Sequence, residues 1–387
     1  QRTLGADARM LVLRRSTKDP NVDSVPMNRL QRLIRRSTIQ RERPSQSVYP
    51  EYRGNVWSTG RISSPVLPYL ERTLPDVVNL HWLGNGLLSV EALAKIRAPM
   101  VWTLHDMWAV TGGCHYAGDC VKYRTGCGSC PQLRSARQRD ISAWTWESKQ
   151  RIWKDLDLTI VAPSHWLADV VRESPILGGC RIEVIPNGID PQVFRPFNTA
   201  FARDVLRLPP DKKLILFGAQ QIDDERKGFA HLAKALALLS GNDDVELVLF
   251  GAQKPELETN LRSHHAGIID NDQVLALLYA SADVFVAPSV QDNLPNTVME
   301  ALMCGTPSIG FHIGGMPDLI DHQISGYLAR PFDAEDLAQG IQWALENRAA
   351  LSQQAHIRSA ARFDLSQAAQ RYLSLYSEVL SRARDHR

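Results

Sequence analysis

The chain has 387 residues, which is enough for two domains of ordinary size rather than one core. Hydrophobic residues make up 44% of it and charged residues 22%, the composition of a soluble globular protein. The net charge of +2 argues against a dedicated nucleic-acid-binding protein, and no apolar run approaches the roughly 18 residues that a membrane span requires.

The first 60 residues are basic, because twelve Lys or Arg residues stand against five Asp or Glu residues. Residues 8–15 are predicted to form a strand. Residues 28–43 are predicted to form a short basic helix with Leu30, Leu33 and Ile34 on one side. Such a helix can lie on an anionic membrane surface, or it can be an ordinary solvated surface helix. The residues alone favour neither hypothesis.

From residue 77 onwards, short apolar strands alternate with amphipathic helices, which is the pattern of a parallel, doubly wound sheet. Residues 194–213 are predicted to be a linker, after which the pattern starts again. The fold class is therefore α/β, with two Rossmann-like domains that face each other across a cleft. In chain order the expected strands are 77–82, 98–106, 158–164, 182–190, 214–219, 245–252 and 284–289, and the expected helices are 87–96, 144–155, 165–174, 229–239, 272–280, one after Asn296, and 364–384.

Four of the six cysteines cluster in a Gly-rich loop at residues 111–133. They are Cys114, Cys120, Cys127 and Cys130. In a cytosolic protein this clustering favours metal over disulfides, and four thiolates suit a structural zinc site. His115 could replace one of them. Two disulfides and four free thiols remain the alternatives.

Residues 288–307, PSVQDNLPNTVMEALMCGTP, combine two carboxylates with the start of a helix. Pro295 fixes its φ angle, and Asn or Thr can cap the exposed amides. Those amides and the helix dipole attract anions. Glu300, on the first turn, can accept two hydrogen bonds from a diol such as a ribose. The segment suggests a nucleotide-sugar site; the alternative is an ordinary strand–loop–helix junction.

Three ordered motifs resemble retaining family-4 glycosyltransferases, and the closest group is the bacterial exopolysaccharide, colanic-acid type. They are the segment just described with Gly314-Gly315 after it, VIPNGID at residues 184–190, and Arg226-Lys227-Gly228. The resemblance runs from about residue 70 to the end of the chain. It departs from the family pattern in three places. Asp292 replaces a Glu, Ala219 stands where many relatives carry an Arg, and an additional amino-terminal strand with its Gly-rich loop is expected but missing.

The resemblance implies the GT-B fold and assigns residues to roles. Its domains are 1–200 on the acceptor side, 201–365 on the donor side, and a final helix, 366–387, that crosses back to the first domain. Arg226-Lys227 could otherwise be a solvated turn, His105 a loop cap and Trp82 a core residue. The implied catalytic residues are His105, Asp106, Arg226, Lys227 and Asp292; the donor-binding residues are Ile269, Asn293, Leu294, Pro295, Asn296, Thr297 and Glu300; the acceptor-side residues are His81 and Trp82.

The activity implied by the resemblance is transfer of a sugar, with retention, from a UDP- or GDP-linked donor to a lipid-linked saccharide in cell-surface polysaccharide synthesis. No catalytic cofactor and no nucleic acid are expected. The expected location is cytoplasmic, on the inner face of the membrane, which favours the membrane hypothesis for the basic helix. The alternatives are a nucleotide-sugar epimerase or hydrolase of the same fold, and a non-catalytic donor-binding subunit. Dinucleotide oxidoreduction is disfavoured, because no G-x-G-x-x-G follows a strand.

Overall fold

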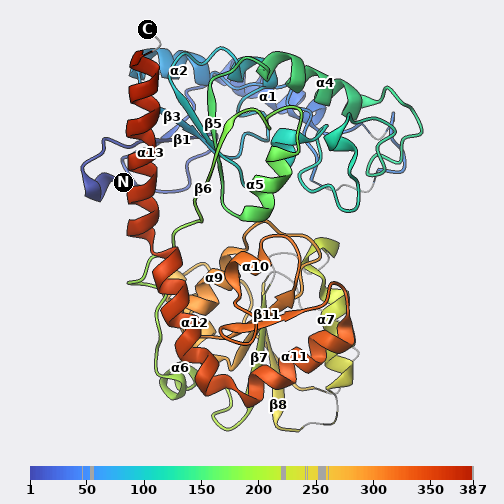
Figure 1. Ribbon diagram of the computed structural model, residues 1–387, viewed down its shortest axis with the longest axis vertical. Helices are drawn as coiled ribbons and strands as arrows, with labels where there is room; N and C mark the ends of the chain where they lie inside the picture. Colours follow the sequence, from blue (N-terminus) through green and yellow to red (C-terminus); the bar gives the residue numbers. More distant parts are fainter. Residues whose placement is uncertain are drawn as a thin grey trace. The chain divides into compact units, whose positions relative to one another are not determined.

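A computed structural model describes residues 1–385 except 46, 53–55, 219–223, 240, 242, 252–258 and 260. The chain forms two compact units, Gln1–Ile185 with Ala369–Arg387, and Pro186–Ala368. Figure 1 shows that helices cover a sheet in each unit. No helix in the described part of the chain has both the length and the apolarity to cross a membrane.

The first unit is built on a four-stranded parallel sheet in which the strands lie side by side in chain order. The strands are β3 (Val78–Leu80), β4 (Met100–Thr103), β5 (Leu158–Ala162) and β6 (Arg181–Val184). The helices are α2 (Val66–Thr73), α3 (Val90–Leu93), α4 (Ile141–Trp153), α5 (His165–Arg172) and the later part of α13 (Leu365–Asp385). The predicted helix over residues 87–96 is thus much shorter, because its N-cap is Ser89 and Pro99 and β4 follow closely.

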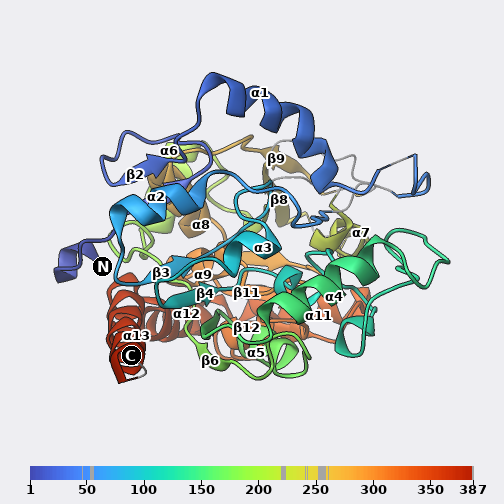
Figure 2. The same cartoon turned by 90° about the horizontal axis from the view of Figure 1, so that it is seen from above.

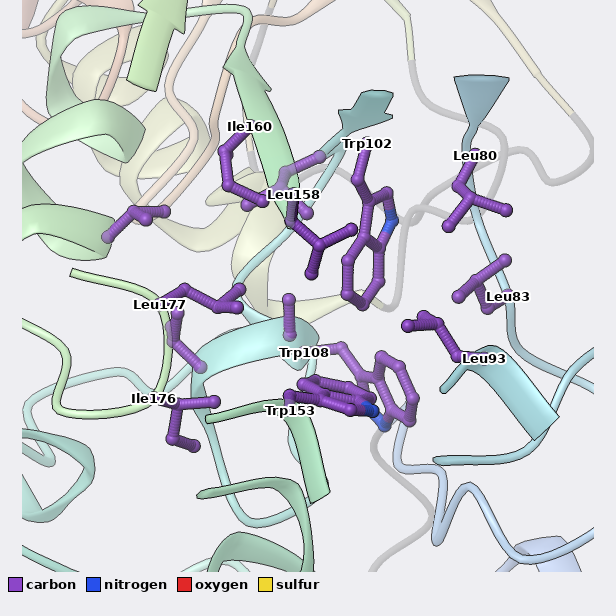
Figure 3. Close-up of a cluster of buried hydrophobic side chains, with 14 of the residues drawn as sticks. Leu80, Leu83, Leu93, Trp102, Trp108, Trp153, Leu158, Ile160, Ile176 and Leu177 are labelled. Atoms are coloured by element: carbon purple, nitrogen blue, oxygen red, sulfur yellow. The ribbon is translucent and has the colours of Figure 1, made fainter. Parts of the chain in front are cut away.

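Three tryptophans form the centre of the first unit's core, packed edge to face (Figure 3). The ring centroids of Trp102 and Trp153 are 5.3 Å apart, and those of Trp108 and Trp153 are 6.1 Å apart. Leucines and isoleucines from the strands and helices surround them. Beneath the opposite face of the sheet, Leu375 and Val379 of α13 pack on Val101 and Val161. Burial of these large side chains, at roughly 1.5–3 kcal/mol each, holds the sheet between its helices.

The amino-terminal segment lies outside this sheet. The predicted strand at residues 8–15 is β1 (Met10–Val12), which pairs in parallel with β2 (Val22–Ser24) in a sheet of its own. The predicted basic helix is α1 (Arg29–Thr38), which begins at a capping box between Asn28 and Gln31, and the 3₁₀ turn η2 (Ile39–Glu42) follows it. A further 3₁₀ turn, η1, spans Arg2–Leu4. Figure 2 shows α1 standing clear of the four-stranded sheet.

The second unit contains a six-stranded parallel sheet with the order β12-β11-β10-β7-β8-β9. This is the strand order of a Rossmann fold, with the two halves of the sheet diverging from β7 and β10. The predicted α/β class with two Rossmann-like domains is confirmed. The strands are β7 (Lys213–Gly218), β8 (Val245–Phe250), β9 (Ser263–His265), β10 (Val284–Ala287), β11 (Ser308–Phe311) and β12 (Gly326–Ala329).

Helices cover both faces of this sheet, and each face has its own buried cluster. One cluster includes α7 and α11, and the other includes α8, α9 and α12. The bounds are α6 (Thr199–Leu206), α7 (Phe229–Leu238), α8 (Asp272–Ser281), α9 (Asn296–Met303), α10 (Met316–Leu319), α11 (Ala334–Glu346) and α12 (Arg348–Phe363).

Two stretches expected elsewhere belong to the second unit. Residues 194–213, predicted to be a linker, contain α6, whose buried Arg203 forms a 2.8 Å ion pair with Asp283. The predicted strand 182–190 ends as β6 at Val184, and residues 186–190 lie in the second unit rather than in a first domain that ends at residue 200. The reason is that the backbone of Ile189 forms hydrogen bonds with the backbone of Phe363 and Leu365, where α12 meets α13.

Candidate functional site

The candidate site of the second unit lies where the sheet's two halves diverge. β7 and β10 are hydrogen-bonded neighbours, while the chain continues from β7 to β8 on one side and from β10 to β11 on the other. Loops that follow such strands separate at the carboxyl edge of the sheet and leave room for a ligand. The 3₁₀ turn η5 (Glu225–Lys227) follows β7, and residues 288–295 follow β10.

Three charged side chains meet at this edge. The carboxylate of Asp292 accepts hydrogen bonds through Oδ2 from Arg226 Nη1 at 3.1 Å and from Lys227 Nζ at 2.8 Å. Asp292 is 9% exposed, whereas the two cationic side chains are 27% and 29% exposed. Two cations are therefore held beside one nearly buried anion, and Arg226 also pairs at 3.2 Å with the more exposed carboxylate of Asp224. Such an arrangement can bind a polyanionic group.

Two glycines bring these segments close enough for those contacts. A Cβ on Gly228 (φ +70°) would lie 1.8 Å from the carbonyl oxygen of Pro288, and the Val290 amide donates to the Arg226 carbonyl at 2.8 Å. A Cβ on Gly314 (φ +52°) would lie 2.2 Å from the carbonyl oxygen of Asp292. Any side chain at either position would displace the backbone and its charged groups.

The start of α9 has amides available for a ligand. Its N-cap is Pro295, and no side chain among the described residues caps it, so the expected capping by Asn or Thr is wrong. The side chain of Asn296 instead accepts a 2.9 Å hydrogen bond from Asn187. The VIPNGID motif thus supports the beginning of α9. The positive end of the helix dipole and the lack of a side-chain cap favour an anion at this point.

Glu300 lies on the inner side of α9. Its carboxylate accepts a 2.9 Å hydrogen bond from the hydroxyl of Tyr279, which is fully buried. Burial raises the pKa of Glu300 to about 7, while the hydrogen bond from Tyr279 lowers it and the charge of Asp272 raises it. One carboxylate oxygen is thus held in place, and the group changes charge close to neutral pH.

The other predicted donor-binding residues lie in two environments. Asn293 is buried in the loop and Leu294 packs in the core, so both hold the loop in shape. Thr297 is half-buried on the first turn of α9. Ile269, predicted to flank a base, is half-buried against the core cluster that contains Tyr279. The structure brings both Arg226 and Lys227 into direct contact with Asp292.

Two histidines pair at the carboxyl ends of neighbouring strands in the first unit. His81 follows β3 and His105 follows β4, and their Nδ1 and Nε2 atoms are 2.9 Å apart with the rings stacked. Both histidines are exposed to solvent, although they stand in a densely packed part of the unit. Burial and the neighbouring His105 lower the pKa of His81 to about 4, and burial also lowers the pKa of His105. The pair is therefore uncharged at neutral pH and suits contact with sugar hydroxyls.

Asp106 is fixed by a network behind this pair. Its Oδ2 atom lies 2.7 Å from Nδ1 of His115, and Nε2 of His115 lies 3.0 Å from the Ser58 hydroxyl. Trp82 is 40% exposed and its ring packs on His115 with the centroids 5.7 Å apart. Both nitrogens of His115 thus have hydrogen-bonding partners, an arrangement that does not favour its suggested replacement of a cysteine as metal ligand. Sequence reasoning missed its role as the partner of Asp106, nine residues away.

Comparisons with known proteins agree with this geometry. Residues 12–193 match the family described as Glycosyltransferase Family 4, and residues 211–347 match the family described as Glycosyl transferases group 1. The chain is a glycosyltransferase of the GT-B type. The Family 4 match falls mainly on the first unit of this glycosyltransferase, and the group 1 match falls within the second.

Two curated relatives and one solved structure illustrate the similarity. The glycosyltransferase is 28% identical over 257 residues to the putative colanic acid biosynthesis glycosyl transferase WcaC of Escherichia coli K12, an alignment that covers 62% of this chain and 60% of the relative. It is 26% identical to the D-inositol 3-phosphate glycosyltransferase of Mycolicibacterium smegmatis, over 79% of this chain and 68% of the relative. Its fold matches Anabaena Alr3699/HepE in complex with UDP and glucose, with a TM-score of 0.60, 17% identity, and coverage of 92% and 91% of the two chains.

The cysteine-rich loop of the glycosyltransferase surrounds a small cavity of about 20 Å³, lined by all four clustered cysteines. All six cysteines are free thiols. Burial raises the pKa of Cys127 to about 12 and also raises that of Cys114. Within the described residues, which include these cysteines, no group of three or more His, Cys, Asp or Glu side chains is placed so that it could hold a metal ion. The thiols as placed do not fit a zinc site.

The structural zinc site is thus a prediction from the sequence alone, and no chemical step depends on it. If it is right, protein purified without chelator carries about one zinc per chain, as a closed four-thiolate site would hold. Elemental analysis measures this directly. A content well below one zinc per chain would remove the hypothesis.

A buried lysine holds the start of this loop. Lys149 of α4 donates hydrogen bonds to the carbonyls of Trp108 and Thr111, and its ammonium lies 3.6 Å from the centre of the Trp108 ring. Complete burial lowers the pKa of Lys149 to about 7, although Cys114 and Cys127 raise it. These hydrogen bonds from the Lys149 side chain to main-chain carbonyls hold residues 108–111, where the loop begins.

We expect Lys149 to make the stability of the first unit depend on pH. Because the pKa of Lys149 is lower in the folded state, the unfolded chain binds more protons between about pH 7 and 10.5. The free energy of unfolding therefore rises with pH in this range, by roughly 1 kcal/mol per pH unit. This contribution is lost as pH falls to 7. Urea unfolding followed by tryptophan fluorescence reports on this unit, which holds eight of the nine tryptophans. Between pH 7 and 9 the Lys149→Met variant should lack the slope; equal slopes in both proteins would refute the assignment.

Proposed function

We propose that this glycosyltransferase moves a sugar, with retention of configuration, from a nucleoside-diphosphate sugar to a lipid-linked saccharide during synthesis of a cell-surface polysaccharide. The observation that carries the proposal is the charged edge of the second unit, where Arg226 and Lys227 converge on Asp292 beside the uncapped start of α9. The name of the E. coli relative and the UDP and glucose bound by the Anabaena structure support it.

Each group in the second unit has a place in this chemistry. The cations and the α9 amides suit the diphosphate, and Glu300 suits the two ribose hydroxyls. As the bond between the anomeric carbon and the diphosphate oxygen breaks, negative charge grows on the leaving group. Arg226 and Lys227 neutralise that charge in place of a metal ion, because preorganised cations stabilise the transition state without reorientation. Asp292 holds the two cations and offers its other oxygen to the hydroxyls of the sugar.

The retaining outcome follows from attack on the same face of the sugar. The acceptor oxygen forms its bond to the anomeric carbon on the side from which the diphosphate leaves, and the acceptor's proton passes to the leaving phosphate oxygen. No carboxylate nucleophile is required. Asp292 supports this route, because two cations share one of its oxygens and reduce its nucleophilicity. In the first unit, the uncharged His81–His105 pair suits hydroxyls of the sugars.

The test is turnover with and without an acceptor. The protein is incubated with UDP-glucose or GDP-mannose, alone or with a membrane extract that contains lipid-linked saccharides, and release of the nucleoside diphosphate is measured. Release that depends on the extract, together with transfer of labelled sugar to lipid, is the expected result. Equal release without the extract would indicate a hydrolase or an epimerase. Binding without any release would indicate a donor-binding subunit.

The acceptor's lipid places the enzyme at a membrane, and α1 provides a surface for it. Leu30, Leu33 and Ile34 are 64%, 64% and 52% exposed on this helix, which also carries four arginines. Exposed apolar side chains flanked by arginines favour an anionic bilayer surface. We expect Leu30→Glu/Leu33→Glu to weaken co-sedimentation with phosphatidylglycerol vesicles at least tenfold. Ile357→Glu, at an equally exposed position on α12, is the control and should bind like wild type; equal binding by both variants would contradict the proposal.

A further inference from the structure

A cavity of about 1180 Å³ opens in the first unit, and none of the residues assigned to the reaction lines it. Its walls come from η2 and the chain that follows it, from Arg61 and Ile62, and from the start of α4 with the residues before it. It exceeds the roughly 300–1,000 Å³ of a typical small-molecule site. The cavity therefore has room for more than one sugar ring.

The wall of this cavity is strongly cationic. Five arginines line it and a single carboxylate, Asp140, stands against them. In the described part of the chain, Arg139 pairs with Glu147 at 3.3 Å, and the other four guanidinium groups have no carboxylate partner. The arginines are Arg41, Arg43, Arg61, Arg137 and Arg139.

The nearby carboxylates are already engaged by the backbone. Asp140 caps α4, where its Oδ1 accepts from the amides of Ser142 and Ala143 and its Oδ2 accepts from the Cys130 amide at 2.8 Å. Glu42 of η2 is 4% exposed and accepts from the amides of Gly60 and Ile62. Neither carboxylate forms an ion pair with the cavity arginines in the described part of the chain, so their guanidinium groups can contact a ligand.

Aromatic side chains complete the cavity. The Tyr49 hydroxyl accepts a 3.0 Å hydrogen bond from the Ile141 amide, which fixes one wall, and Tyr52 is buried beside it. Trp144 is 53% exposed, with the Arg139 guanidinium 5.6 Å from its ring centre. An exposed indole face suits the apolar face of a sugar ring, and guanidinium groups suit phosphate and carboxylate oxygens in pairs.

We propose that this cavity binds the anionic part of the acceptor, a saccharide that bears phosphate, diphosphate or uronate groups. The inference rests on the proposed function, because a glycosyltransferase needs a second substrate besides its donor. The cavity binds the anionic groups through its arginines and the neighbouring ring through Trp144. The enzyme thereby distinguishes a charged acceptor from a neutral saccharide of the same size.

Calorimetric binding to the full chain, with the donor site kept saturated by UDP, tests the proposal. The probes are inorganic pyrophosphate, a glucuronate-containing tetrasaccharide and the same tetrasaccharide after reduction of its carboxyl groups. The two anions should bind, more weakly at high salt, and the reduced saccharide at least tenfold more weakly than the acidic one. Arg43→Gln/Arg61→Gln should weaken anion binding at least tenfold. Arg151→Gln, an exposed arginine of α4 outside the cavity, is the matched control and should change nothing.

Equal binding of the acidic and reduced saccharides would overturn the inference, as would unchanged anion binding in Arg43→Gln/Arg61→Gln. Binding of phosphatidylglycerol vesicles through these arginines, with no binding of the soluble anions, would overturn it in favour of a lipid surface. Arg137→Gln, from the opposite wall, serves if the double variant does not fold. Nucleoside-diphosphate affinity, measured separately with UDP and GDP, should be the same in all these variants; failure of the wild type to bind either nucleotide would refute the proposed function and not the cavity.

Discussion

Replacing Lys227 by alanine should lower kcat/KM for sugar transfer at least tenfold, which is about 1.4 kcal/mol of transition-state stabilisation. The Lys227 ammonium lies 2.8 Å from Asp292 and is 29% exposed, so it is fixed at one end and accessible to a ligand. Without it, one of the two cations that neutralise the leaving diphosphate is missing. The loss should appear mainly in kcat, because the charge to be neutralised grows as the bond breaks.

Steady-state rates for wild type, Lys227→Ala and Lys234→Ala separate this role from a general effect of charge. Lys234 is an exposed lysine on α7 of the same unit, so its replacement removes the same charge at a different place. Lys234→Ala should retain wild-type kcat/KM. Turnover of Lys227→Ala within a factor of two of wild type would remove this residue from the site.

Replacing Glu300 by glutamine should weaken UDP binding at least tenfold and remove part of its pH dependence. With a pKa of about 7, the carboxyl group must lose its proton before it can accept hydrogen bonds from both ribose hydroxyls. Wild-type affinity should therefore fall as pH is lowered from 8 to 6. The amide of glutamine does not titrate and accepts through a single oxygen.

The terminal phosphate of UDP also titrates in this range, so the difference between the two proteins is the quantity of interest. Calorimetric titration of UDP into wild type and Glu300→Gln at pH 6, 7 and 8 measures this difference in affinity. Glu335→Gln, at an exposed position on α11, is the control and should follow the wild type. Identical pH profiles for wild type and Glu300→Gln would show that Glu300 does not contact the nucleotide.

Much of the fold was predictable, because parallel strands buried on both faces and amphipathic helices have strong periodic patterns. The errors lie where contacts between residues far apart in the chain outweigh the local pattern. The pattern predicts a linker over residues 194–213, whereas α6 forms there and its buried Arg203 pairs with Asp283, 80 residues away. The boundary after Val184 depends on pairing between Ile189 and the junction of α12 and α13, which the sequence does not reveal.

The candidate site was predictable as a set of residues but not as an arrangement. Arg226, Lys227, Asp292 and Glu300 were recognised from motifs, whereas the direct ion pairs among the first three and the bond from Tyr279 to Glu300 require the structure. The arginines of the large cavity come from three separate stretches of the chain, each an ordinary basic surface segment by itself. Neither their convergence nor the engagement of Asp140 and Glu42 by the backbone has a signal in the sequence.

The most direct test of the account is calorimetric binding of UDP, GDP and ADP to the wild type, each with and without Mg²⁺, and to Lys227→Ala and Glu300→Gln. The account predicts that one nucleotide binds clearly better than the other two, that Mg²⁺ is not required, and that both variants bind it at least tenfold more weakly. Binding of none of the three, or equal affinity in wild type and both variants, would contradict a nucleoside-diphosphate site between η5 and the start of α9.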